Sequence, residues 1–205
     1  MTKVKQNFIF FSFLIFWISF VSLVAAKKYV SPQQYLEDCF QLSKKVYDSK
    51  FRPTFLIALW RGGAPVGIVV DEYFRYMGAS IEQHIALRTI AYHGDELQSA
   101  VKIFNFDYVL ENISSDDKLL IVDDVVDSGK TIQEVLKQIT EKCGANRPKD
   151  IRVAAVYYKP KKSSIRPDYY LHATDLWLVF PHEIEGLTID EVRDCKSLEI
   201  AKTLR

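Results

Sequence analysis

Short, almost purely apolar runs of strand length are the feature that most restricts what this chain can fold into. Lys118–Val122 (KLLIV) shows it best, and Thr54–Trp60 (TFLIALW) and Ile151–Tyr158 repeat it. None of these runs shows the polar–apolar alternation of a half-exposed strand, so each strand must be covered on both faces. Helical patterns lie between the runs, and strands that alternate with helices are typical of a parallel sheet. The sequence therefore predicts an α/β fold with a central parallel sheet flanked by helices.

The segments between these runs carry helix signals. Ser31 followed by Pro32 is typical of a helix start, and Gly78 and Gly144 are typical of helix ends. The expected helices are Ser31–Asp48, Ala64–Met77, Thr131–Cys143 and Thr188–Ala201. The remaining expected strands are Ile81–Ile90, Asp168–Leu171 and Asp175–Phe180. Ala91–Asp117 is polar and irregular, and we expect a mobile loop with an edge strand there.

Composition narrows the function classes. The 205 residues suffice for one ordinary domain plus a short extra segment, and 48% of them are apolar, enough for a sizeable core. The 27 basic and 26 acidic residues give a net charge of +1, which argues against a dedicated nucleic-acid binder. Cys39, Cys143 and Cys195 are an odd number without a CxxC pair, which supports neither a disulfide framework nor a cysteine zinc site. A reducing compartment is the simpler expectation.

Polar residues follow three of the predicted strands. Arg61 and two glycines come after Trp60, two acids come after Val122, and Lys159 comes after Tyr158. In parallel sheets ligands bind beyond the carboxyl ends of the strands. We therefore expect these three loops to form one site.

The segment Leu119–Thr131 (LLIVDDVVDSGKT) carries the strongest chemical signal. Its strand ends in two acids, and a small polar loop leads into a helix whose free amides and dipole suit a phosphate. Ser128 and Thr131 add hydroxyl donors, and Gly129 allows close approach of the backbone. A Walker-type loop would need glycine where Asp124 stands, and an acid there would repel a nucleotide pyrophosphate, so we reject an ATPase.

These residues resemble the PRPP-binding motif of the type I phosphoribosyltransferases, where PRPP is phosphoribosyl pyrophosphate. The resemblance covers about residues 29–200 and is closest to the hypoxanthine, guanine and xanthine members. It implies the type I fold with a small hood. It also implies that Asp123 and Asp124 bind the ribose hydroxyls, one of them through Mg²⁺. The 5-phosphate would lie against Asp127–Thr131, that is Asp127, Ser128, Gly129, Lys130 and Thr131, and Asp127 would be the general base or acid.

The same resemblance implies roles outside this motif. The residues implied to bind pyrophosphate are Arg61, Gly62, Gly63 and Arg88, with a cis peptide bond between Trp60 and Arg61. Those implied to bind the base are Lys159, which donates to the 6-oxo group, Trp177, which stacks, and Leu178, which contacts position 2. Glu183 resembles an acid that holds a second magnesium. Thr89 and Ile90 depart from the serine-tyrosine pair of the hypoxanthine-guanine branch, which puts the role of Tyr92–Phe104 as a closing loop in doubt. His84, His93, His172 and His182 show no metal-ligand spacing, and we expect them to be structural or solvated.

The sequence thus predicts a magnesium-dependent purine salvage enzyme that acts on PRPP and a 6-oxopurine, binds no nucleic acid and forms a homo-oligomer. Two alternatives stay open. One is a transferase for another base, and Lys159 with Trp177 argues against it. The other is a regulator that senses PRPP or a nucleotide, and the retained Asp127 argues against that.

An apolar segment precedes this domain. Phe8–Ala26 is uncharged and long enough to approach a membrane span, with lysines on both sides. A membrane anchor and a translation start downstream of it fit equally well. A signal peptide fits less well, because the rest of the chain resembles an enzyme with a cytosolic substrate. We therefore divide the chain into residues 1–28 and a domain of residues 29–205, with a cytoplasmic domain expected.

Overall fold

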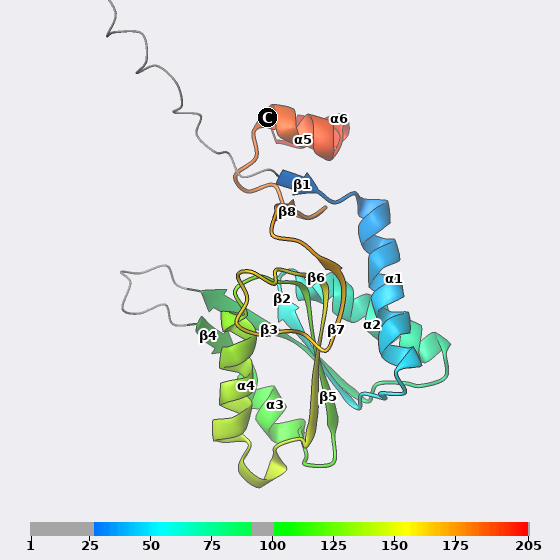
Figure 1. Cartoon of the computed structure of the whole chain (residues 1–205), viewed down its shortest axis with the longest axis vertical. Coiled ribbons are helices and arrows are strands. Elements are labelled where there is room, and N and C mark those ends of the chain that lie inside the picture. Colours follow the sequence, from blue (N-terminus) through cyan, green and yellow to red (C-terminus); the bar gives the residue numbers. More distant parts are fainter. Residues whose placement is uncertain (1–26, 92–100, 205) are drawn as a thin grey trace, which may run out of the picture.

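A six-stranded sheet forms the centre of the computed structural model, which describes residues 27–91 and 101–204 (Figure 1). Its strands are β2 (Phe55–Trp60), β3 (Gln83–Ala91), β4 (Val101–Phe104), β5 (Lys118–Val126), β6 (Asp150–Tyr158) and β7 (Tyr169–Ala173). They lie in the order β4-β3-β2-β5-β6-β7. All neighbours are parallel except β3 and β4, which are antiparallel. The predicted α/β fold with a central, mostly parallel sheet is confirmed.

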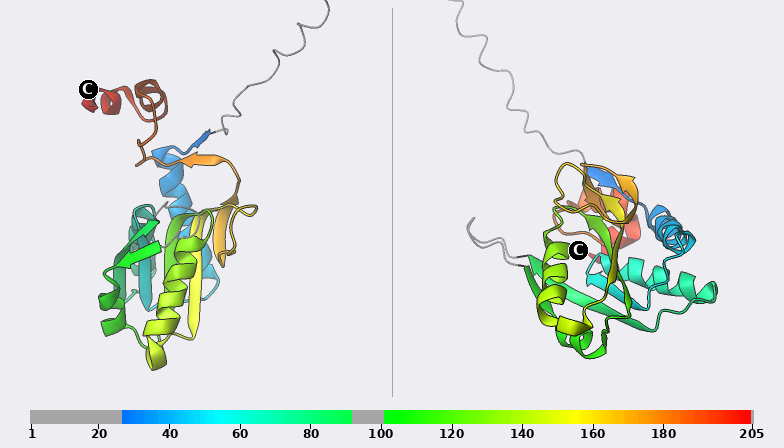
Figure 2. Two further views of the ribbon diagram at one scale, coloured as in Figure 1. Left: turned by 90° about the vertical axis from the view of Figure 1, so that its left-hand side faces the viewer. Right: turned by 60° about the horizontal axis from the view of Figure 1, so that its bottom comes forward.

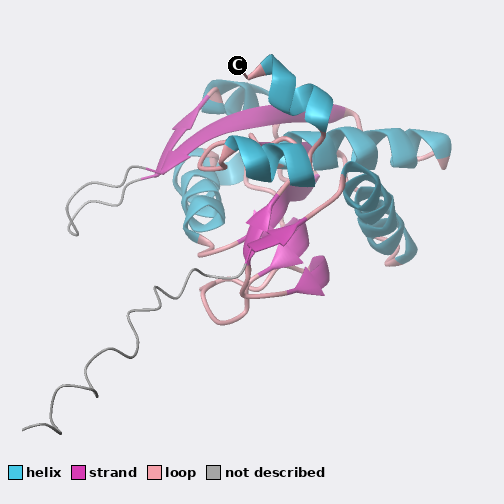
Figure 3. Cartoon of the chain, turned by 90° about the horizontal axis from the view of Figure 1, so that it is seen from above, coloured by secondary structure: helices cyan, strands magenta, loops and turns pink. Residues whose placement is uncertain are grey.

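Helices cover both faces of this sheet (Figure 3). α1 (Pro32–Asp48) and α2 (Gly63–Tyr76) lie on one face, and α3 (Phe106–Asn112) and α4 (Lys130–Lys142) lie on the other (Figure 1). Successive residues of β5 point to opposite faces, so Leu120 packs in the core below α1 and α2 while Ile121 packs in the core below α3 and α4. This double coverage explains why the strand runs are apolar without alternation.

A second, smaller unit lies beyond the carboxyl ends of the sheet strands (Figure 2). It contains β1 (Lys27–Tyr29), β8 (Trp177–Val179), α5 (Ile189–Cys195) and α6 (Leu198–Thr203). β1 pairs with β8 in parallel. The Lys27 ammonium and the Tyr29 hydroxyl donate to Glu191 Oε1 at 2.6 and 2.9 Å, which ties β1 to α5. This unit is the hood that the family resemblance implies, and Lys27 and Lys28 belong to it rather than to the preceding segment.

The structure corrects several predicted elements. β5 continues to Val126, because it keeps pairing with β6 as far as Tyr158, so the two acids lie inside the strand. Residues 106–112 form α3 where we expected an irregular segment, since Phe106 and Val109 bury an apolar face. The predicted final helix is two helices. The first begins at a capping box between Thr188 and Glu191, and Ser197 caps the second.

The apolar segment Phe8–Ala26 and most of the predicted closing loop, residues 92–100, lie outside the described residues. Among residues 27–91 and 101–204, none of the helices has the length and apolar character needed to cross a bilayer. Cys39, Cys143 and Cys195 are all free thiols.

Candidate functional site

The loops after β2 and β5 meet where the connections of the sheet change direction. β2 and β5 are neighbours, yet the chain leaves β2 toward α2 on one face and leaves β5 toward α4 on the other. Such a switch point opens a crevice at the carboxyl ends of the strands, where ligands bind in this class of sheet. β6 is the next strand, so Lys159 ends at the same edge. The predicted convergence of the three loops is confirmed.

The two glycines after β2 let this loop touch the end of β5. A Cβ on Gly62 would lie 2.0 Å from Asp124 Oδ2, and a Cβ on Gly63 would lie 2.5 Å from the Val122 carbonyl oxygen. The Tyr35 hydroxyl donates to the Gly62 carbonyl oxygen at 3.2 Å. The peptide bond between Trp60 and Arg61 is cis, as the resemblance implies. Glycine is therefore needed here for close approach.

Two arginines face a hollow beside this loop. A cavity of about 410 Å³ is lined by Trp60, Arg61, Arg88, Thr89 and Ile90. Arg88 is opposite Trp60 in the pairing of β2 with β3, and its guanidinium lies 5.0 Å from the centre of the Phe104 ring. Arg61 lies 3.9 Å from the Glu185 carboxylate, and both side chains are exposed. Two guanidinium groups on one hollow suit a polyanion.

The acids of β5 are poorly compensated. Asp124 is 6% exposed, and Asp123 Oδ1 accepts a hydrogen bond from the Asp124 amide at 3.0 Å. Burial, together with the negative charge of Glu183, raises the pKa of Asp124 to about 7. Burial and the neighbouring Asp124 raise the pKa of Asp123. The pair is therefore short of positive charge in the protein alone.

The loop between β5 and α4 contains a residue with a left-handed backbone conformation that only glycine adopts readily. Gly129 has φ of 80°, and a Cβ there would lie 2.9 Å from Ser163 Oγ. An amide of the first turn, that of Gln133, bonds to the Gly129 carbonyl at 3.0 Å. The amides before it are not used by the helix, and they point with the helix dipole toward the loop. Residues 127–131 thus form a glycine-containing turn at a helix start, the local geometry that the predicted phosphate site requires.

Asp127 is held by two lysines. Its Oδ2 lies 3.0 Å from the Lys159 ammonium, and its Oδ1 lies 2.7 Å from the Lys162 ammonium. Burial raises the pKa of Asp127, but the ion pair with Lys162 and the hydrogen bond from Lys159 outweigh burial, so the net pKa is below its usual range. The carboxyl group is therefore ionised, and a proton acceptor rather than a donor in the free protein.

The hood supplies the other predicted residues. Trp177 is 60% exposed, so it is available for stacking and is not a core residue, whereas Leu178 is buried. Glu183 Oε2 accepts a hydrogen bond from the Phe180 amide at 3.0 Å. Within the described ranges, no three His, Cys, Asp or Glu side chains come close enough to hold a metal ion together. The predicted ligands Asp123, Asp124 and Glu183 therefore do not form a closed metal cage, although the charge of Glu183 acts on Asp124.

Three residues at this site escaped sequence reasoning. His182 Nε2 lies 3.7 Å from Asp124 Oδ2, although we expected a structural or solvated histidine. Its ring stacks on Phe180, with centroids 5.8 Å apart and an interplanar angle of 8°, and burial lowers the pKa of His182. Lys162 and Tyr35 were also missed. A lysine three positions after Lys159 was a weak signal for the first, and no spacing pattern marked the others.

Comparison with known proteins gives an independent view. Residues 26–181 match the family described as phosphoribosyl transferase domain. A purine phosphoribosyltransferase from Pyrococcus horikoshii is 25% identical with a TM-score of 0.62, and the match covers 79% of this chain and 97% of that one. The Helicobacter pylori xanthine-guanine-hypoxanthine phosphoribosyltransferase is 25% identical with a TM-score of 0.63, covering 78% and 96%. A Neisseria gonorrhoeae protein with bound ppGpp is 21% identical with a TM-score of 0.65, covering 88% and 98%, and this likeness concerns the fold.

Proposed function

The chain belongs to the phosphoribosyltransferase family, and on that premise we propose that it transfers the 5-phosphoribosyl group of PRPP to a 6-oxopurine. The products are the nucleoside 5-monophosphate and pyrophosphate. One observation carries the proposal: an acid pair short of positive charge and an ionised Asp127 flank a single anion-binding turn. PRPP needs a site for its phosphate and acids for its hydroxyls and its metal ion, and the incoming base needs a proton acceptor.

The acid pair fits a magnesium ion. Mg²⁺ prefers carboxylate oxygens, and it commonly keeps waters and substrate phosphates as its other ligands, so two protein carboxylates suffice. Asp123 and Asp124, whose raised pKa values report missing positive charge, would hold it with the ribose hydroxyls, and Glu183 would hold a second ion. When bound, Mg²⁺ neutralises charge on the pyrophosphate leaving group.

Each protein loop has a distinct task in this proposal. Asp127–Thr131 binds the 5-phosphate through amides and hydroxyls. The pyrophosphate binds at the cavity beside the loop after β2. Its protein partners are Arg61, Gly62 and Gly63 in that loop and Arg88 in β3. These contacts fix the sugar carbon C1 against the base, and orientation of this kind supplies much of the rate in transfer reactions.

Asp127 removes the proton that the base must lose. As a purine ring nitrogen forms its bond to C1, the bond from C1 to the pyrophosphate oxygen breaks, and the proton at N7 passes to the Asp127 carboxylate. An ionised carboxylate is the state that this step needs. Removal of this group is the sharpest test of the chemistry.

Base selection rests on the turn after β6 and on the hood. The Lys159 ammonium carries only donors, so it fits a 6-oxo group and disfavours a 6-amino group. The exposed Trp177 offers a flat surface for stacking, and the backbone at Leu178 contacts position 2. We therefore expect hypoxanthine, guanine or xanthine to be the substrate and adenine to be poor.

Three further expectations accompany the proposal. The domain acts in the cytoplasm, where PRPP is made, and residues 8–26 associate with a membrane if they are retained. It works as a homo-oligomer. Its partners are small molecules, namely PRPP and a purine base.

Calorimetry and a substrate panel test the proposal. The full chain should bind PRPP with MgCl₂ and convert at least one 6-oxopurine, with little adenine turnover. Absence of PRPP binding would remove the assignment. Efficient adenine turnover would discredit Lys159 as the reader of the base, and turnover of orotate or uracil alone would favour a transferase for another base. Intact PRPP binding without turnover of any base would favour a sensing regulator.

A further inference from the structure

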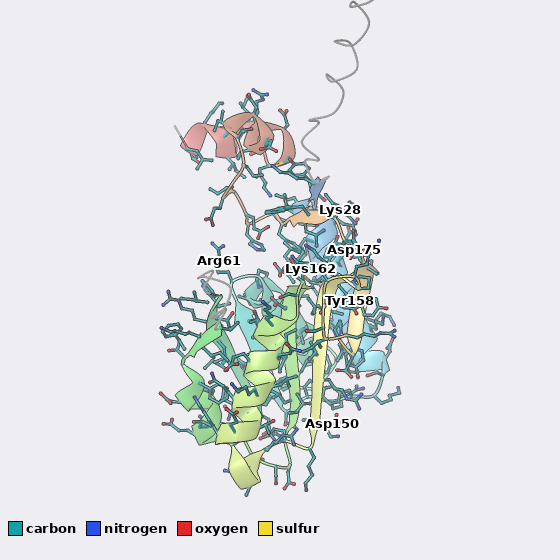
Figure 4. All side chains as sticks on the ribbon, turned by 60° about the vertical axis from the view of Figure 1, so that its left-hand side comes forward. Lys28, Arg61, Asp150, Tyr158, Lys162 and Asp175 are labelled. Atoms are coloured by element: carbon teal, nitrogen blue, oxygen red, sulfur yellow. The ribbon has the colours of Figure 1, made fainter. Side chains whose placement is uncertain are left out.

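The carboxylate of Asp127 is divided between two lysines from one short turn. Lys159 is 11% exposed and pairs with Oδ2, whereas Lys162 is 62% exposed and pairs with Oδ1. Lys162, Asp175 and Arg61 lie at the same end of the sheet, far from Asp150 at the other end (Figure 4). Lys162 therefore lies at the end of the sheet where the ligand crevice opens.

The turn that carries both lysines is fixed to the anion-binding loop by its backbone. The amides of Lys162 and Ser163 donate to the Lys159 carbonyl at 3.2 and 2.9 Å. The amide and the hydroxyl of Ser164 both donate to the Ser128 carbonyl at 3.1 Å. These backbone contacts anchor the turn that carries Lys162 to the loop that carries Asp127.

Binding of the base would change the contacts of Lys159 but not those of Lys162. If the proposed function holds, Lys159 donates to the 6-oxo group of the purine, and its contact with Asp127 is shared or lost. Lys162 lies outside, toward solvent, and has no such second partner in the reaction. Asp127 would then depend on Lys162 for a fixed orientation during proton transfer.

We propose that Lys162 is a positioning residue, whose ammonium holds one oxygen of Asp127 while Lys159 turns to the base. This inference rests on the proposed function for its purpose, but not for the ion pair itself. The charged groups closest to Asp127 along the chain of these elements include Lys159 and Lys162 in this turn, Lys130 at the start of α4, and Asp123 and Asp124 in β5. Both turn lysines lower the pKa of Asp127.

The test replaces Lys162 by methionine and compares it with a matched control. Lys161→Met removes the same charge one residue earlier, where the ammonium is 87% exposed and lies 3.7 Å from Asp175. In Lys162→Met, we expect kcat to fall roughly tenfold with little change in the KM for PRPP, because one proton acceptor is less well oriented. The acidic limb of kcat/KM moves to higher pH, because the free carboxylate loses a cation that lowers its pKa. Lys162→Arg should restore most of both, and Lys161→Met should change neither.

A measurement that needs no turnover separates this inference from the proposed function. The carboxyl carbon of Asp127 is followed by NMR in the free protein, assigned by the signal missing from Asp127→Asn. Its titration should move to higher pH in Lys162→Met and stay in place in Lys161→Met. An unmoved titration in a folded Lys162→Met protein overturns the inference even if purine turnover is found. If the Asp127 titration moves in Lys162→Met but the wild-type protein turns over no purine, the ion pair between Lys162 and Asp127 is upheld and only the proposed reaction is removed.

Discussion

Asp124 and Asp127 are three positions apart in the chain, yet the protein shifts the pKa values of their carboxyl groups in opposite directions. Asp124 lies inside β5 against Gly62, and burial with the charge of Glu183 raises its pKa to about 7. Asp127 lies one residue past the strand, and the ion pair with Lys162 and the hydrogen bond from Lys159 bring its pKa below the usual range despite burial. The strand end therefore needs a cation from outside, whereas the turn has its cations built in.

The difference in pKa suits Asp124 and Asp127 to two different chemical roles. A carboxylate without a counter-charge is suited to a metal ion or to sugar hydroxyls, which stabilise its ionised form on binding. A carboxylate kept ionised by neighbouring lysines is ready to accept a proton. In the proposed function, the opposite shifts divide ligand binding from proton transfer between neighbouring residues.

Replacing Asp127 by asparagine should remove the proton acceptor and leave the acids of β5 in place. The amide cannot take the purine proton, so kcat should fall by about 10²- to 10⁴-fold. PRPP affinity should stay within a few-fold of wild type, because the backbone amides and hydroxyls of the turn and the acid pair are kept. Stopped-flow or steady-state turnover gives the first quantity, and calorimetry with PRPP and MgCl₂ gives the second. Unchanged turnover would remove the assignment of Asp127 as general base.

How much of this could be predicted from sequence differs between the two acids. The apolar strand and the following SGKT turn predicted the fold and both acids, because burial and helix starts leave local patterns. The length of β5 was wrong, since pairing with β6 is a tertiary contact that carried the strand through two charged residues. The directions of the two pKa shifts were not predicted, because they depend on Glu183 and Lys162, which lie far from β5 in the chain.

Gly62 and Gly63 also show that sequence alone does not reveal contacts between strands. Their use as anion binders was predicted from the amides that they leave open. The second reason, that the space is already taken by Asp124 and the Val122 carbonyl, needed the distance across two strands. Likewise α3 was missed, because its short apolar face has meaning only against the neighbouring core.

Replacing Gly62 by alanine should disturb the strand end without touching the turn. The new Cβ would lie 2.0 Å from Asp124 Oδ2, so the carboxyl group must shift, and overpacking of this kind costs about 2–3 kcal/mol of unfolding free energy. Urea denaturation gives the cost. In an Asp124→Ala background the same change should cost much less, since the clashing group is gone. An equal cost in both backgrounds would place the strain elsewhere.

Replacing Asp124 by asparagine tests the charge deficit itself. The raised pKa means that the folded protein holds a proton that the unfolded chain has released, so stability falls as pH rises from about 4 to about 7. An uncharged amide at this position removes this loss, and without magnesium we expect a gain of about 2 kcal/mol at pH 8 that disappears toward pH 4. Thermal unfolding across this pH range measures it. The exposed Asp116→Asn is the control, and a gain that did not vary with pH would show that charge is not the cause.

Magnesium should act on the strand end alone, with the smallest effect. A ligand that binds only the folded protein stabilises it by about 1.4 kcal/mol at ten times its Kd, which is a rise of a few degrees in Tm for a domain of this size. Because Asp124 is the deeper of the two uncompensated acids, Asp124→Asn should lose most of this rise, and Asp127→Asn should keep it. Matched ionic strength with NaCl removes general screening. An equal rise in wild type and Asp124→Asn would place the ion elsewhere.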